Sequence, residues 1–111
     1  MVKEIDSVGL VEKLKSDDET ILLDIRGANE LAQGILPNSQ HLPMHMLPLR
    51  ISEFPKDKEI VLYCRSGARS YNACYFLMQQ GYENVVNLRG GIMDWAQKGL
   101  EIELPSQACC G

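Results

Sequence analysis

The chain has 111 residues, a length typical of one domain, and 45% of them are hydrophobic while 23% are charged. These proportions are those of an ordinary globular protein with enough apolar residues to build a core. The formal net charge of −4 argues against a nucleic-acid-binding protein, because such proteins hold phosphates through a basic surface.

The sequence indicates neither a membrane segment nor an oxidising compartment. No apolar run approaches the ~20 residues that a membrane-spanning helix needs. Residues 1–19 carry charges where a secretory signal would be hydrophobic. The four cysteines form a poor disulfide framework, because Cys109 and Cys110 are adjacent and Cys74 falls in a helical pattern. We therefore expect a cytoplasmic protein without a membrane or nucleic-acid partner.

Strand-like and helix-like segments alternate along the chain. In chain order the expected strands are residues 3–6, 20–25, 40–42, 59–63 and 84–88, of which the second, fourth and fifth are apolar runs typical of strands covered on both faces. The first expected helix has Ser7 as its N-cap, and the later ones cover 29–34, 47–54, 68–82 and 90–99. This alternation predicts an α/β fold, with a small, mostly parallel central sheet and helices on both faces. Residues 1–104 should form a single domain, followed by a flexible, cysteine-containing tail over 105–111.

Three polar loops follow the three apolar strands. They cover residues 24–27, 64–69 and 89–91, and each contains an arginine. Because the carboxyl ends of parallel strands meet at one edge of a sheet, we expect these loops to form one site.

Cys64 stands where the second of these loops begins. The strand ends at Tyr63, the chain turns through residues 65–67, and a helix begins near Ala68. Backbone N–H groups of such a turn, with a helix N-terminus, form a concave site for anions. A cysteine at its entrance should have a lowered pKa, because the helix dipole and neighbouring arginines favour the thiolate. We expect a nucleophile here, with a buried inert thiol as the alternative.

Other side chains have simpler expectations. Ser66 and Ser70 offer short hydroxyl donors, and Ser70 should help to settle the first helical turn. Cys74 is expected to be a packed core thiol, with a role as a resolving partner as the alternative. No Cys-x-x-Cys or paired His and Cys spacing is present, so no metal site is predicted.

Three segments together resemble the single-domain rhodaneses, a sulfurtransferase family, over residues 20–104. The first is "LLDIRGANELAQGILP", with Asp-x-Arg after a strand and a glutamate four residues beyond the arginine. The second is "VLYCRSGARS", which resembles the active-site loop, and the third is "NVVNLRGGIMDW". Three signatures in the right order are more specific than any single motif. The family often has Gly-His-Ile-Pro where this chain has residues 34–37, a departure that we expect to affect loop packing more than chemistry.

The resemblance implies a mechanism. Cys64 would attack the outer sulfur of an anionic donor such as thiosulfate and become a persulfide. It would then pass this sulfur to cyanide, a thiol or a protein acceptor, with no cofactor. The implied substrate-binding loop consists of Arg65, Ser66, Gly67, Ala68 and Arg69, whose amides would hold the sulfur and whose arginines would supply positive charge.

Further residues receive supporting roles from the resemblance. Asp24 and Arg26 should form a polar support for the loop, Glu30 should pair with a nearby basic group, and Arg89 should do similar work from the last strand. The tail cysteines Cys109 and Cys110 are candidates for a sulfur relay, with an inert tail as the alternative.

Two other functions stay open. Related phosphatases and arsenate reductases use Cys-x5-Arg to hold a tetrahedral oxyanion, whereas Cys64 and Arg69 form the shorter Cys-x4-Arg. The shorter loop favours sulfur transfer. A non-catalytic rhodanese-like module for protein binding is the other alternative, although such modules usually lack the loop cysteine.

Overall fold

The computed structural model describes residues 1–17 and 19–104, and its centre is a sheet of five parallel strands. The strands are β1 (Lys3–Ile5), β2 (Ile21–Asp24), β3 (Gln40–His41), β4 (Ile60–Tyr63) and β5 (Val85–Leu88). They lie in the order β1-β5-β4-β2-β3, so the three apolar strands occupy the middle of the sheet. The predicted parallel sheet is confirmed.

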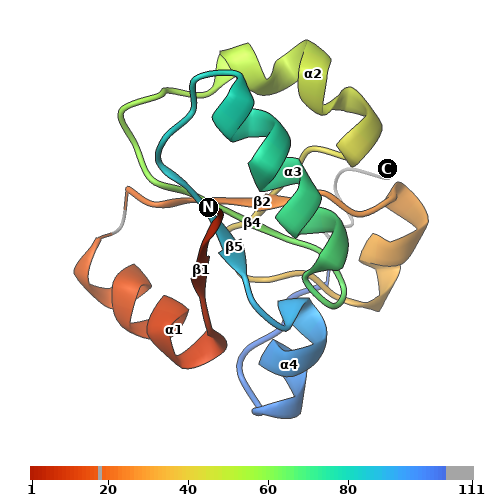
Figure 1. Cartoon of the computed structure of the whole chain (residues 1–111). Helices are drawn as coiled ribbons and strands as arrows, with labels where there is room; N and C mark the ends of the chain where they lie inside the picture. The colour runs from red at the N-terminus through yellow and green to blue at the C-terminus, as the bar shows by residue number, and fades with distance from the viewer. Residues whose placement is uncertain (18, 105–111) are drawn as a thin grey trace.

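Helices cover both faces of this sheet (Figure 1). The α-helices are α1 (Ser7–Ser16), α2 (Leu47–Arg50), α3 (Ala68–Gln79) and α4 (Gly91–Gln97). Three short 3-10 helices are η1 (Ala28–Gln33), η2 (Met44–Met46) and η3 (Ile51–Glu53). Figure 1 shows α2 and α3 on one face, and α1 and α4 on the other. This is the predicted α/β arrangement, except that the helix expected over 47–54 is divided into short turns of different winding.

The central strands are mostly apolar because the side chains of each strand contribute to two cores. In β4, Ile60 and Leu62 belong to the core beneath α2 and α3, whereas Val61 and Tyr63 belong to the core beneath α1 and α4. Successive side chains of a strand point to opposite faces, so a strand buried on both sides is apolar at most positions rather than at every second one.

Two expectations need comment. Ser7 does not cap α1: the N-cap is Asp6, whose carboxylate accepts a hydrogen bond from the Gly9 N–H at 2.8 Å. Because β1 ends at Ile5, the helix starts one residue earlier than predicted, and the buried Ser7 hydroxyl instead donates to Asp94 at 2.9 Å. The predicted tail, residues 105–111, lies outside the described residues.

No helix within residues 1–17 and 19–104 is both long enough and apolar enough to cross a membrane.

The start of α4 is joined closely to the loop after β4. The N–H groups of Ile92 and Met93 donate to the carbonyls of Cys64 and Arg65, each at 3.0 Å. Gly91, the first residue of α4, lies very close to the backbone of this loop. A Cβ atom at position 91 would lie 2.5 Å from the Cys64 carbonyl oxygen and 2.4 Å from the Arg65 carbonyl oxygen. Only glycine fits at this position.

Replacement of Gly91 by alanine should therefore displace the loop as well as strain the backbone. Gly99 is a matched control, because its φ of 73° resembles the 60° of Gly91 while no atom lies within 4 Å of an added Cβ. We expect Gly91→Ala to lower the free energy of unfolding in urea by at least ~2 kcal/mol more than Gly99→Ala, which carries only the left-handed backbone cost. Equal losses in the two variants would contradict this close approach.

Candidate active site

The loop between β4 and α3 surrounds the sulfur of Cys64. Cys64 directly follows β4 and is only 1% exposed. The Gly67 N–H donates to its Sγ at 3.1 Å, and the Ser70 hydroxyl oxygen lies 3.5 Å from the same sulfur. Gly67 has a left-handed backbone with φ of 100°, which glycine adopts without steric cost and which turns the chain into α3. The structure thus brings Cys64, Gly67 and Ser70 together.

These donors decide the protonation of Cys64. Burial by itself raises the pKa of this thiol, but the Ser70 hydroxyl and the backbone N–H groups of Ser70, Gly67 and Ser66 together lower the pKa below its ordinary value. Cys74 shows the opposite result, because burial and the charge of Glu4 raise its pKa to about 12. Of these two buried thiols, Cys64 is the one prepared to ionise.

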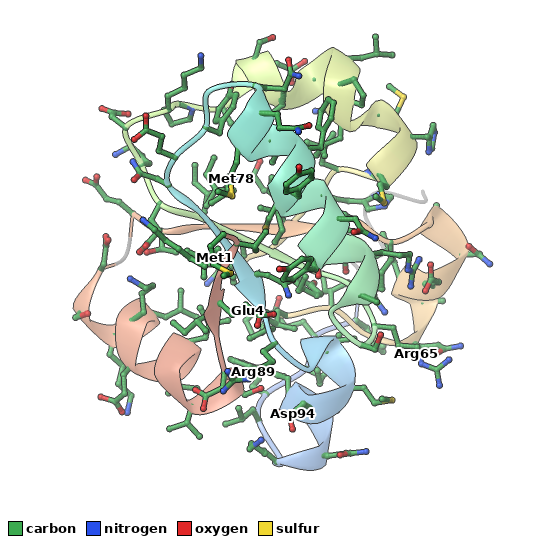
Figure 2. The ribbon with its side chains drawn as sticks, viewed as in Figure 1. Met1, Glu4, Arg65, Met78, Arg89 and Asp94 are labelled. Atoms are coloured by element: carbon green, nitrogen blue, oxygen red, sulfur yellow. The ribbon has the colours of Figure 1, made fainter. Side chains whose placement is uncertain are left out.

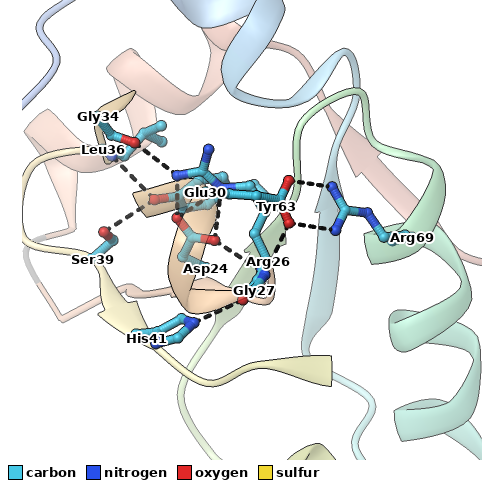
Figure 3. Close-up of polar contacts among 10 residues, drawn as sticks. All are labelled: Asp24, Arg26, Gly27, Glu30, Gly34, Leu36, Ser39, His41, Tyr63 and Arg69. Carbon is cyan, nitrogen blue, oxygen red and sulfur yellow. Dashed lines mark hydrogen bonds and ion pairs between the residues drawn. The ribbon is translucent and has the colours of Figure 1, made fainter. Parts of the chain in front are cut away.

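Arg69 is held by a carboxylate from another segment. Its guanidinium donates to both carboxylate oxygens of Glu30, at 2.8 and 2.9 Å, which connects α3 to η1 (Figure 3). The hydrogen bonds from Arg69 lower the pKa of Glu30 to about 2 against the opposing effect of burial, and the pair raises the pKa of Arg69. Glu30 also accepts from the Gly27 N–H at 2.9 Å. The structure gives Glu30 a basic partner, as expected, and that partner is Arg69.

Asp24 and Arg26 form a buried ion pair after β2. Arg26 donates through Nε to Asp24 at 3.0 Å and through a terminal nitrogen to Asp24 at 2.7 Å, and these side chains are 4% and 1% exposed. The same terminal nitrogen donates to the Gly34 carbonyl at 2.7 Å, and His41 Nε2 lies 2.7 Å from the Arg26 carbonyl (Figure 3). The pair therefore fixes the turn between β2 and η1, which carries Glu30.

Tyr63 anchors the segment in which the chain departs from the rhodanese pattern. Its hydroxyl accepts from the Leu36 N–H and donates to the Ser39 hydroxyl, both at 3.1 Å. Burial and the charge of Asp24 raise its pKa, so the hydroxyl stays protonated as a donor. Leu36 is completely buried, so this segment is packed by apolar contacts.

Two further arginines lie apart from each other. Arg65 is exposed in the loop and lines a cavity of about 270 Å³ together with Glu30 and Ile92. Arg89 is 63% exposed and lies 3.8 Å from Asp6, at the start of α1. Figure 2 shows the two side chains well apart, with Arg89 beside α1 and Arg65 on the other side of α4. The remaining loop residues, Ser66 and Ala68, are both exposed. The tail cysteines Cys109 and Cys110 lie outside the described residues.

One buried residue near the site was not singled out from the sequence. Asn87 is 1% exposed in β5, and its side chain bonds to the Gly67 carbonyl and the Ser70 hydroxyl. The available signal was a single amide inside the apolar run Val-Val-Asn-Leu, because a buried polar side chain needs a partner.

Within the described part of the chain, no group of three or more His, Cys, Asp or Glu side chains is arranged to hold a metal ion.

Comparison with known proteins identifies the family. Residues 7–98 match the family model of the rhodanese-like domain. A sulfurtransferase of Allochromatium vinosum is 56% identical over 105 residues, which are 95% of this chain and 98% of the relative. The putative sulfurtransferase YtwF of Bacillus subtilis is 43% identical over 94 residues, 85% of this chain and 90% of that protein. A crystal structure of a rhodanese-related protein from Thermoplasma volcanium matches with a TM-score of 0.84 and 32% identity, covering 92% of this chain and 98% of that one. The chain therefore belongs to the rhodanese-like domain family and has its fold.

Proposed function

We propose that this protein is a sulfurtransferase in which Cys64 carries the transferred sulfur as a persulfide. The observation that carries the proposal is the position of the Cys64 sulfur, which is buried and hydrogen-bonded by Gly67 and Ser70 so that its pKa is lowered. The two relatives named as sulfurtransferases, which match nearly all of the chain, support the same role.

The proposed donor is thiosulfate or a related sulfane sulfur compound. The Cys64 thiolate attacks the outer sulfur, a new S–S bond forms, and the original S–S bond breaks with its electron pair leaving on sulfite. The terminal sulfur of the persulfide then passes to cyanide, giving thiocyanate, or to a thiol or a protein acceptor, and the Cys64 thiolate is restored. Backbone N–H groups of the loop stabilise the anionic sulfur at each stage.

The length of the loop supports sulfur rather than phosphate chemistry. Four residues separate Cys64 from Arg69, and Gly67 already directs its N–H at the cysteine sulfur. Arg69 is also engaged by Glu30 through two hydrogen bonds, so its charge is largely occupied. We infer that the exposed Arg65 contributes more to the attraction of an anionic donor.

The persulfide is tested by intact mass after incubation with thiosulfate. We expect the protein to gain one sulfur atom, which cyanide removes and which is absent in Cys64→Ser. Cys74→Ala is the control and should keep the gain, because this thiol is buried and stays protonated. Sulfur that remains on Cys64→Ser would refute the assignment.

The double variant Cys109→Ser/Cys110→Ser tests the proposed relay, which predicts slower transfer of sulfur to acceptors with unchanged loading of Cys64.

The role of Arg65 is tested by steady-state kinetics. Removal of an exposed charge beside the site should raise the KM for thiosulfate about fivefold in Arg65→Ala, with a smaller effect at high salt. Arg50→Ala is the control, because Arg50 is a partly exposed arginine of α2 that pairs with Glu53. A KM for Arg65→Ala no higher than that of Arg50→Ala would argue against the proposed attraction.

The pH dependence of loading follows from the pKa of Cys64. Because the thiolate is the attacking form, the rate of persulfide formation should rise with pH through the Cys64 pKa and then level off, at a pH below the pKa of a free cysteine. Ultraviolet absorbance of the thiolate, measured as the difference from Cys64→Ser, should titrate over the same range. An inflection above that of free cysteine would contradict the hydrogen-bonded thiolate.

A further inference from the structure

Strand β5 buries an amide on the face of the sheet that carries Cys64. Asn87 is 1% exposed and follows Val85 by two residues, so both point toward the core that contains Cys64 and Leu62. A buried amide destabilises a protein unless its donors and acceptor are paired. The groups that bond to the Asn87 amide should therefore explain why this buried position is polar.

The amide of Asn87 has only one orientation that satisfies its neighbours. Its Nδ2 group donates to the Gly67 carbonyl at 3.2 Å and to a carboxylate oxygen of Glu4 at 2.8 Å. Glu4 lies opposite Asn87 in the β1·β5 register. Both partners are acceptors, so a reversed amide would place oxygen against oxygen. The Asn87 oxygen is thereby directed at the Ser70 hydroxyl.

Ser70 has one proton for two acceptors. Its fully buried hydroxyl lies 2.5 Å from Asn87 Oδ1 and 3.5 Å from Cys64 Sγ. While Cys64 is a thiol, Ser70 can donate to Asn87 and accept from the S–H group. Once Cys64 is a thiolate, the same proton stabilises its charge only if it turns away from Asn87 and toward the sulfur.

We propose that Asn87 is a positioning residue for the nucleophile. It holds two of the residues that donate to the Cys64 sulfur, Gly67 through its carbonyl and Ser70 through its hydroxyl, and it competes with that sulfur for the single Ser70 proton. Ser70 therefore acts as a two-position donor whose resting position is set from β5. The importance of this arrangement for turnover rests on the proposed function, whereas the hydrogen-bond competition can be measured without it.

Other charged and titratable groups also surround the sulfur. The outer side of the site carries the Arg69–Glu30 pair, between α3 and η1, and the exposed Arg65 of the loop. Glu4 of β1 bonds to the Asn87 amide from the other side. Cys74 belongs to the same core as Cys64. A test must leave all of these groups unchanged, so only uncharged replacements at positions 70 and 87 are suitable.

The test is a double-mutant cycle on the Cys64 pKa, measured from thiolate absorbance against the same variant carrying Cys64→Ser. Ser70→Ala should raise the Cys64 pKa by about one pH unit, because the thiolate loses a donor. Asn87→Leu removes the support of Gly67 but also frees the Ser70 proton for the sulfur. Asn87→Leu should therefore raise the Cys64 pKa by about half a unit more in the Ser70→Ala background than in the protein that retains Ser70. Equal shifts in both backgrounds would overturn the competition.

Asn84→Leu is the matched control, because Asn84 is an exposed asparagine before the same strand whose amide donates to the Lys56 carbonyl. It should leave the Cys64 pKa unchanged. If Asn87→Leu does not fold, nuclear magnetic resonance on the unaltered Asn87 replaces it: the side-chain amide signals should move along the Cys64 titration, and this movement should be strongly reduced in Ser70→Ala. Movement that persists undiminished in Ser70→Ala would refute the link through Ser70.

The outcome is separable from that of the proposed function. A non-additive cycle in a protein that gains no sulfur on Cys64 would refute the persulfide and keep the positioning role of Asn87. An additive cycle in a protein that does gain sulfur on Cys64 would keep the persulfide and refute the positioning role of Asn87.

Discussion

The carbonyl groups of Cys64 and Arg65 accept hydrogen bonds from backbone N–H groups in the first turn of α4. The rest of the site depends on these two hydrogen bonds. A loop whose N–H groups converge on one sulfur must direct several of its carbonyls away from it, and buried carbonyls need donors. The start of a helix has N–H groups without partners in its own helix. Ile92 and Met93 provide them at 3.0 Å, and Gly91 permits the close approach. The loop and α4 thus satisfy each other's backbone groups.

The same loop resolves a conflict between burial and charge. Cys64 and Cys74 are both almost inaccessible and belong to one core, so desolvation opposes the thiolate in both. Cys64 differs in having donors at its sulfur, and hydrogen bonds to a charged group are worth roughly 1.5–3 kcal/mol each. This explains why the pKa of Cys64 falls while that of Cys74 rises to about 12. The fold distinguishes the thiols by the donors at the sulfur, namely the Ser70 hydroxyl and several backbone N–H groups, rather than by exposure.

The sequence was sufficient to predict the strands, the parallel sheet and the loop that begins at Cys64, because these depend on apolar runs and local turn residues. The directions of long side chains were less accessible. Glu30 and Arg69 are separated by 39 residues, and Asn87 contacts Ser70 and Glu4 over 17 and 83 residues. Such contacts exist only once the order of the strands is known. Arg89, which follows β5 at the same sheet edge, extends instead to Asp6 because its exposed side chain has no packing that would direct it inward.

The loop is held from three independent directions, which bears on how it would handle a change at the sulfur. Its carbonyls are held by α4, Gly67 and Ser70 are held from β5 by Asn87, and Arg69 is held from η1 by Glu30. Donors fixed in this way need little rearrangement when negative charge develops, which is the condition under which preformed dipoles stabilise a reacting anion most. The Ser70 hydroxyl is the exception, since it can rotate without moving any backbone atom. A rigid set of N–H groups combined with one rotatable hydroxyl would allow a single loop to accommodate the thiol, the thiolate and the proposed persulfide in turn.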